Sequence, residues 1–196
     1  MKFKILFLFF FTAADFLVAQ NFNAGFRIGV CGSQVNGDNL SGYNKAGLIA
    51  GAFVNRNFSD HFSIQMEMIY IQKGSRKPTD INNDYYRLRV HYIEVPLLVV
   101  FHASKKIDFT LGPSFGTLIF SEENDEFGVF RDTPPFKKFE LSGNAGIVYK
   151  LSDNWSLDGR YSNSLTTIRP YPGVYSTFFD RGQYNLLLEF SLMYKF

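Results

Sequence analysis

Charged residues recur on one face of segments whose sequence alternates between apolar and polar residues. Charges held away from bulk water must pair, because an unpaired buried charge is expensive. A group of inward-facing charged residues can form salt bridges that plug the interior, or it can carry protons or ions along a path. We expect the plug, in which at least one arginine makes an ion pair with Glu67 or Glu94. The expected interior charge network consists of Arg27, Glu67, Glu94, Asp108, Asp158, Arg160, Glu189 and Lys195.

The three histidines offer less chemistry. His61 and His102 flank short turns, so a surface or interface position is expected for both. His91 lies near one end of a strand-like segment, where it could meet a serine and a carboxylate as a hydrolytic triad requires, but no spacing demands this. The glycines alternate along strands and do not open a helix, so no phosphate-binding loop is expected. The sequence therefore predicts no catalytic residue, no metal site and no cofactor.

The C-terminal segment 183–196 indicates which kind of element positions the charges. Almost every second residue in it is apolar or aromatic, and this period of two indicates a strand with one apolar and one polar face. Leu187 and Met193 are exceptions, because they fall on the polar face. The strand ends on Tyr194 and Phe196, a pattern typical of outer-membrane barrels. We expect these two residues to be the assembly signal that the barrel-assembly machinery reads.

Seven further segments show similar strand character, and they exceed the 9–11 residues or so that a tilted membrane strand needs. Because the repeated charges lie opposite a nearly unbroken apolar face, the apolar face is predicted to contact lipid and the charges to point inward. A soluble ligand-binding barrel would have the reverse arrangement. The predicted fold is an all-β, eight-stranded antiparallel up-and-down transmembrane β-barrel. Its strands are expected at 22–35, 46–58, 62–73, 88–102, 107–120, 136–151, 155–168 and 183–196.

The connections between these segments alternate in length. Short connections are expected at one rim, facing the periplasm, and long polar loops at the other rim, facing the exterior. Eight strands then return the C-terminus to the periplasmic side. Pro96 and Pro113 lie inside strands, where each removes a ladder donor, so a bulge or bend is expected near each. The short connections are 59–61, 103–106 and 152–154, and the long ones are 36–45, 74–87, 121–135 and 169–182.

The first residues have the composition of a secretory signal peptide. Lys2 and Lys4 precede a short apolar run, and small residues near Ala19 suit cleavage, so we expect a signal peptide at 1–19 and a barrel domain at 20–196. Aromatic residues make up 18% of the chain, which fits lipid-facing bands. The formal net charge is only +2, which gives no reason to expect nucleic-acid binding. Cys31 is the single cysteine, and we expect it to be buried.

Several sequence strings occur together in an order that resembles a known family. They are GFRIGV at 25–30, FSIQMEMIYIQKG at 62–74, YIEVPLL at 92–98, LGPSFG at 111–116, GIVY at 146–149, LDGRYS at 157–162 and LMYKF at 192–196. Together they resemble the outer-membrane β-barrel family of Bacteroidetes that is often labelled porin-family or PorT-family, with an OmpA/OmpX-like eight-stranded barrel. The resemblance implies a barrel in the cell outer membrane, and it implies little about activity.

Three functions remain open at this point. The first is a non-enzymatic barrel with structural, adhesion or partner-binding roles, since loops on a rigid scaffold often carry binding. The second is a narrow channel or a secretion-machinery component, and the third is a lipid A-modifying enzyme. We favour the first, as a monomer whose partners are outer-membrane lipid, lipopolysaccharide and the barrel-assembly machinery. The loop stretches with aromatic and charged residues are 84–87, 122–126 and 169–175.

Overall fold

The computed structural model describes residues 22–38, 40–77, 85–125, 128–129, 134–170 and 182–196, and the expected signal peptide at 1–19 lies outside them. Eight long strands and two strands of two residues make up the described part. No helix in these ranges has the length and apolar character needed to cross a membrane. The strands are β1 (Phe22–Asn36), β2 (Lys45–Asn57), β3 (Phe62–Lys77), β4 (Tyr86–His102), β5 (Ile107–Asp125), β6 (Gly128–Val129), β7 (Phe139–Lys150), β8 (Trp155–Ser164), β9 (Arg169–Pro170) and β10 (Gly182–Lys195).

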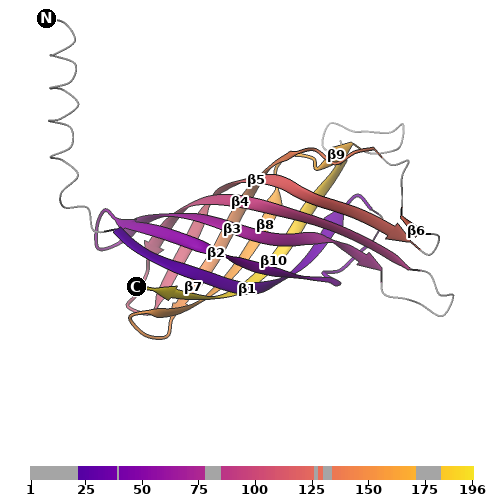
Figure 1. Ribbon diagram of the computed structural model, residues 1–196. Helices are drawn as coiled ribbons and strands as arrows, with labels where there is room; N and C mark the ends of the chain where they lie inside the picture. The colour runs from indigo at the N-terminus through magenta and orange to yellow at the C-terminus, as the bar shows by residue number, and fades with distance from the viewer. Residues whose placement is uncertain (1–21, 39, 78–84, 126–127, 130–133, 171–181) are drawn as a thin grey trace, which may run out of the picture.

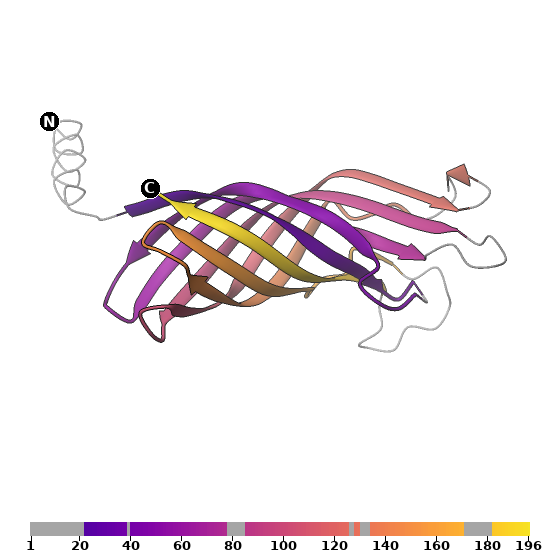
Figure 2. The same cartoon turned by 90° about the horizontal axis from the view of Figure 1, so that it is seen from below.

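The long strands form a closed antiparallel ring in which each strand pairs with its neighbour along the chain. The order is β1-β2-β3-β4-β5-β7-β8-β10, and β1 also pairs with β10 from Gly25↔Lys195 to Asn36↔Tyr184. This pairing closes the sheet, so the barrel has no free edge along these strands. Figures 1 and 2 show the tilted strands wrapping into one cylinder. The predicted up-and-down barrel is therefore confirmed.

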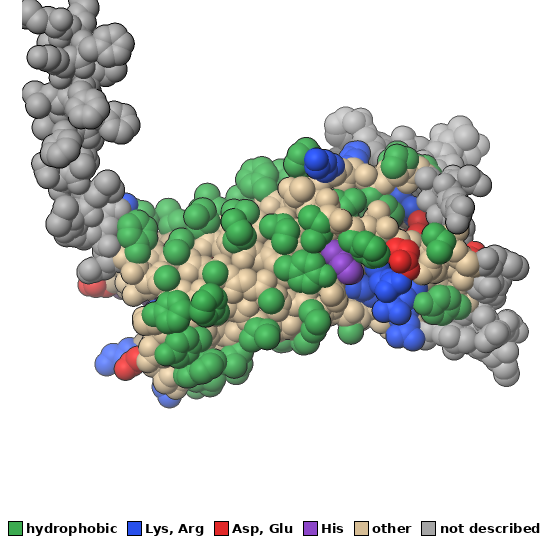
Figure 3. Space-filling view, viewed as in Figure 1, with side chains coloured by type: hydrophobic (Ala, Val, Ile, Leu, Met, Phe, Trp, Pro, Cys, Tyr) green, Lys and Arg blue, Asp and Glu red, His purple; other side chains and the backbone are tan. Residues whose placement is uncertain are grey.

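The two faces of the wall follow the alternation in the sequence. On β1, Phe26 and Ile28 are 59% and 65% exposed on the outside, whereas Arg27 between them is 1% exposed inside the barrel. Hydrophobic side chains cover much of the outer surface between the two ends (Figure 3). Leu187 and Met193, the two exceptions of the last strand, are buried inside the barrel. Their place in the interior explains why they broke the pattern.

The two ends of the barrel differ as expected. Short turns at 58–61, 103–106 and 151–154 lie at one end, together with the beginning of β1 and the C-terminus (Figures 1 and 2). At the other end the predicted loops 74–87 and 121–135 are partly wrong, because the sheet continues into them. Lys77 pairs with Tyr86, and Tyr86 pairs with Asp125. The strands β3, β4 and β5 therefore project beyond the rest of the wall at the long-loop end.

The two prolines interrupt the ladders without changing their register. The β3–β4 pairing has a gap between Met66↔Leu97 and Ile69↔Glu94, which spans Pro96. The expected bulge is therefore not at the proline, because the same register continues on both sides of the gap. The register of β4 against β5 shifts instead between His91 and Tyr92. The loss of one donor thus leaves a local gap, which the long ladders tolerate.

Candidate functional site

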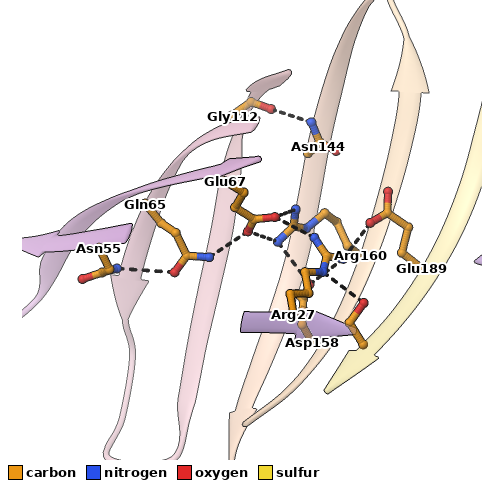
Figure 4. A network of polar contacts seen from close by, with 10 residues as sticks. Arg27, Asn55, Gln65, Glu67, Gly112, Asn144, Asp158, Arg160 and Glu189 are labelled. Carbon is orange, nitrogen blue, oxygen red and sulfur yellow. Dashed lines mark hydrogen bonds and ion pairs between the residues drawn. The ribbon is translucent and has the colours of Figure 1, made fainter. Parts of the chain in front are cut away.

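Two arginines and one glutamate join opposite walls of the barrel. Arg27 on β1 places Nη1 2.8 Å from Oε2 of Glu67 on β3, and Arg160 on β8 places Nη2 2.8 Å from Oε1 of the same carboxylate. Arg160 also donates from Nη1 to Glu67 Oε2 at 3.1 Å, which makes this pair bidentate. Figure 4 shows both guanidinium groups converging on Glu67. The predicted ion pair between an arginine and Glu67 is confirmed.

Two further carboxylates complete this group, which we call the arginine cluster (Arg27, Glu67, Asp158, Arg160 and Glu189). Glu189 Oε2 lies 2.7 Å from Nη2 of Arg27. Asp158 Oδ2 lies 3.0 Å from Arg27 and 3.1 Å from Arg160, although neither of its oxygens makes an aligned hydrogen bond. Asp158 therefore contributes mainly through its charge, and Glu67 through charge and hydrogen bonds together.

The arginine cluster fills the barrel at its level. Strands β3 and β8 are four places apart in the eight-membered ring in either direction, so the Glu67–Arg160 contact spans the full width. The side chains of Arg27, Glu67, Asp158 and Arg160 are all 0% exposed. Gly146 pairs with Arg160, and a Cβ at this glycine would lie 2.7 Å from Oγ1 of Thr110, so a larger residue would crowd the wall here. Water therefore does not reach these four side chains.

A second buried group, the lysine cluster (Lys73, Glu94 and Glu140), lies nearer the long-loop end. Nζ of Lys73 on β3 is 3.1 Å from Oε1 of Glu140 on β7, and it also makes an ion pair with Glu94 on β4. Glu140 accepts hydrogen bonds from Ser142 at 3.0 Å and from Asn185 at 3.1 Å. The expected network thus forms two clusters, in which Glu94 pairs with Lys73 and with neither arginine. The sequence interpretation missed Lys73 and Glu140.

Apolar side chains occupy much of the interior between and above the two clusters, so the expected polar filling is only partly right. Along the inner face of β3, Ile69 and Ile71 separate Glu67 from Lys73, and both are buried. Cys31 is 2% exposed, as expected, and its Sγ lies 3.3 Å from the Gln72 carbonyl oxygen. The buried apolar group contains Cys31, Val35, Ile49, Ile69, Ile71, Leu88, Val90, Tyr92, Ile168 and Leu187.

Asp108 and Lys195 do not join either cluster, contrary to expectation. Asp108 lies near the short-turn end, where Oδ1 is 2.8 Å from Lys150 Nζ and 2.9 Å from His102 Nδ1. Asp108 and Lys195 both line a cavity of about 410 Å³ that lies at this end of the barrel. Their strand positions have the predicted inward parity, but parity does not determine height along the barrel axis. The cavity is a vestibule, and Gln65 in its lining donates to Glu67 of the arginine cluster at 2.7 Å.

A third ion pair lies at the long-loop end. Arg169 on β9 donates to both carboxylate oxygens of Glu123 on β5, at 2.5 and 2.9 Å, and its Nε donates to Gln183 at 2.6 Å. The Tyr86 hydroxyl donates to Glu123 at 2.6 Å. Within the described part of the stretch 122–126, residues 122–125 therefore belong to β5, and Glu123 faces inward. Among the described residues no group of histidine, cysteine and carboxylate side chains could hold a metal ion.

The neighbours of His91 do not form the triad that was considered. Its Nδ1 lies 2.9 Å from the hydroxyl of Tyr70, and its ring stacks at a tilt on Phe120 with centroids 4.8 Å apart. Gln72 donates to the same tyrosine hydroxyl at 3.0 Å. The partner of the imidazole is thus a phenol and not the serine that an acyl-transfer triad requires. This outward-facing group is better described as an aromatic cluster on the outer wall.

The aromatic C-terminus packs against the neighbouring strands at the short-turn rim. The rings of Phe26 and Phe196 are 5.2 Å apart in an edge-to-face arrangement, and those of Trp155 and Tyr194 are 4.8 Å apart. The backbone N–H of Phe196 donates to Ala24 at 3.0 Å. Phe196 remains 64% exposed on the outside of the wall. Both residues of the expected assembly signal are therefore part of the closing seam of the barrel.

A closed ring of long tilted strands with an apolar exterior and buried interior charges defines an outer-membrane β-barrel protein. The family model described as "Outer membrane protein beta-barrel domain" matches residues 18–169, and the chain belongs to this family. Its location is the cell outer membrane. None of the curated proteins is a significant match to the sequence.

Solved structures share this fold at low sequence identity. Ail, the attachment invasion locus protein of Yersinia pestis, is 15% identical with a TM-score of 0.53, and the match covers 89% of this chain and 98% of Ail. Neisserial surface protein A is 12% identical with a TM-score of 0.54, and the match covers 88% of this chain and 97% of that protein. At these identities the similarity establishes the fold alone.

Proposed function

We propose that this protein is a non-enzymatic outer-membrane scaffold that presents its long-loop end to the exterior for a structural, adhesion or partner-binding role. The observation that carries the proposal is the closure of the barrel by the arginine cluster, whose central side chains are 0% exposed. A sealed barrel does not serve as a diffusion pore, so its useful surface is the outside. The PorT-type assignment within Bacteroidetes and the monomeric state belong to the same proposal.

The projecting strands support a binding role for the outer end. Strands β3, β4 and β5 continue beyond the other strands, and the Arg169–Glu123 pair with Tyr86 ties the outer ends of β4 and β5 to β9. A rigid platform loses little conformational entropy when a partner binds, so less of the binding energy is needed to order it. Adhesion is one such role, and attachment is what the name of Ail describes for that protein. The proposed partner is a molecule on the surface of another cell, or another protein, that reaches this platform.

Planar-bilayer conductance tests whether the barrel is sealed. The wild-type protein should give no steady conductance, whereas Glu67→Ala with Arg160→Ala should open a path, because it removes the contact that spans the barrel. Asp153→Asn is the matched control, since this exposed carboxylate lies in a short turn outside the cluster. A steady ohmic current through the wild-type protein would contradict the scaffold and favour the second candidate.

That second candidate is a narrow channel or a secretion-machinery component. The vestibule of about 410 Å³ at the short-turn end favours it, because it would be the inner mouth of such a path. Binding of cells or purified surface proteins to bacteria that carry the barrel separates the two candidates. Replacing 171–181 with a Gly-Ser linker of equal length should reduce adhesion, whereas replacing the short turn 103–106 should not. Equal adhesion by both variants and by cells without the barrel would reject the adhesion role.

A further inference from the structure

We propose that the outward face of β3, β4 and β5 at the long-loop rim binds a phosphate group of lipid A, the membrane-embedded part of lipopolysaccharide. The arginine rim (Arg76, Arg87 and Arg89) would hold this phosphate. The inference rests on the proposed function in one respect, since it requires the long-loop end to face the exterior. Lipopolysaccharide then surrounds this end of the barrel in the outer leaflet.

The arginines of the rim are neighbours on the same face of the wall. Arg76 on β3 pairs directly with Arg87 on β4, and Arg89 follows two residues later on the same face as Arg87. Directly opposed like charges in a sheet are destabilising. An anion bound between them would remove this repulsion. Figure 3 shows basic side chains gathered beside a histidine and an acidic residue near the long-loop end.

The carboxylates on the described part of this face do not neutralise the rim. Glu122 on β5 makes an ion pair with Arg89, and it is the carboxylate that pairs with Arg89 in the β4–β5 register. Three arginines and this one glutamate leave a formal charge of +2. The Nε atoms of Arg87 and Arg89 are buried without a hydrogen-bond partner. Guanidinium groups with excess positive charge on the outer face suit a phosphate, which accepts several charge-assisted hydrogen bonds.

The position of the rim relative to the apolar surface identifies the phosphate as one attached to a lipid. Directly below the arginines on the outer face lie Gln72, His91 and Phe120, and below them Tyr70, Ile93 and Phe115. The side chains of Phe115 and Phe120 are 63% and 41% exposed. Acyl chains can pack against this apolar surface while the headgroup phosphate reaches the rim. A soluble phosphate would contact only the arginine rim and would leave the apolar residues below it without a partner.

The opposite end of the barrel offers a matched comparison. Arg56 on β2 also faces outward, but its guanidinium lies over the rings of Phe22 and Phe58, at 5.9 and 4.9 Å. It stands near the short-turn rim, where phospholipids and not lipopolysaccharide form the leaflet. Arg56→Gln therefore removes one outward positive charge without affecting the proposed phosphate site.

Native mass spectrometry of the refolded barrel in detergent tests the proposal. The probes are diphosphoryl lipid A, the same lipid after enzymatic dephosphorylation, and phosphatidylglycerol. Wild-type barrel and Arg56→Gln should bind diphosphoryl lipid A with the same affinity. Arg87→Gln should bind about tenfold more weakly, because it loses charge-assisted hydrogen bonds to the phosphate. Arg76→Gln with Arg87→Gln should lose more, and the wild-type affinity should fall as salt rises.

Three results would overturn the proposal: equal affinity of Arg76→Gln/Arg87→Gln and the wild type, equal affinity for dephosphorylated lipid A, or equal affinity for phosphatidylglycerol. Heat-modifiable migration on gels shows for each variant that the barrel has formed. If the barrel is folded and non-conducting and the arginine variants bind lipid A as tightly as the wild type, this inference is rejected and the proposed scaffold stands. A conducting wild-type barrel would reject the scaffold and leave the lipid site to be judged by its own binding data.

Discussion

The arginine cluster and the lysine cluster neutralise buried carboxylates in different ways. In the arginine cluster two planar guanidinium groups share Glu67, and contacts extend from β1 and β8 across to β3. In the lysine cluster one ammonium group lies between Glu94 and Glu140, and Glu140 also takes hydrogen bonds from Ser142 and Asn185. The first cluster therefore depends mainly on charge pairing across the barrel, with Gln65 as a neutral donor to Glu67 at 2.7 Å, whereas neutral donors contribute more to the second.

This difference indicates where a substitution should reduce the stability of the barrel most. A guanidinium group has five N–H donors in a fixed plane and can bond to several carboxylates at once. Removing the carboxylate that both arginines share leaves two buried cations with fewer partners. Removing Lys73 leaves two carboxylates, of which Glu140 still has neutral donors and Glu94 can become neutral by binding a proton. We therefore expect larger effects in the arginine cluster than in the lysine cluster.

Glu67→Gln should produce the largest loss of stability. The amide cannot neutralise Arg27 and Arg160, and breaking a buried pair from one side costs about 3–5 kcal/mol. Urea titration of the refolded barrel in lipid vesicles measures the change in the free energy of unfolding. Asp153→Asn, which removes an exposed carboxylate in a turn, should leave the midpoint unchanged. A shift for Glu67→Gln no larger than that of the control would show that the cluster does not stabilise the barrel.

Lys73→Met should cost less, about 2–3 kcal/mol, because Ser142 and Asn185 still donate to Glu140 after the ammonium group is lost. The same titration measures it under the same conditions. Methionine is nearly as long as lysine and keeps the apolar contacts of its stem. A larger loss for Lys73→Met than for Glu67→Gln would reverse the ranking of the two clusters.

A double-mutant cycle on Arg27 and Glu67 should give a coupling of about 1–2 kcal/mol. Arg27→Met alone exposes Glu67, Glu189 and Asp158 to mutual repulsion, and combining it with Glu67→Gln removes one of these charges. The double variant should thus be more stable than the sum of the two single losses predicts. Additive losses would mean that the 2.8 Å contact contributes no interaction of its own.

Arg160→Lys should have the smallest effect, about 1 kcal/mol, because it keeps the charge and loses only the bidentate geometry with Glu67. The matched change in the other cluster is Lys73→Arg, whose larger head must displace Tyr92, over which Nζ now lies at 5.0 Å. Chemical denaturation of both variants compares the two. If Arg160→Lys is as damaging as Glu67→Gln, geometry outweighs charge in the arginine cluster.

Much of the barrel could be predicted because the period of two in the sequence carries the inside–outside assignment. Phe26, Arg27 and Ile28 alternate in sequence and therefore in exposure. The same parity could have placed Lys73 and Glu140 inside, since they continue the inner faces marked by Glu67 and Ser142. On β3, Ile69 and Ile71 interrupt the polar face and make it look mixed, which hid Lys73.

The sequence could not establish which inward charges meet. Pairing across the ring depends on the tilt and stagger of the strands, which place Arg160 opposite Glu67 and leave Asp108 near the short-turn end. Alternation fixes the face of a residue and leaves its height undetermined. The extent of β3, β4 and β5 was also underestimated, because polar residues such as Arg87 and Asn124 resemble a loop while they continue the ladder.

The pairing of the first and last strands has a consequence for the order of folding. Arg27 bonds to Ser191 and Glu189, which are 164 and 162 residues away along the chain. Contacts with such long loops form late, because loop-closure entropy must be overcome before they stabilise anything. The seam cannot close until the C-terminal strand has arrived, and only then does Arg27 reach all its carboxylates. Sealing of the interior and closure of the wall are thus one event, at the end of assembly.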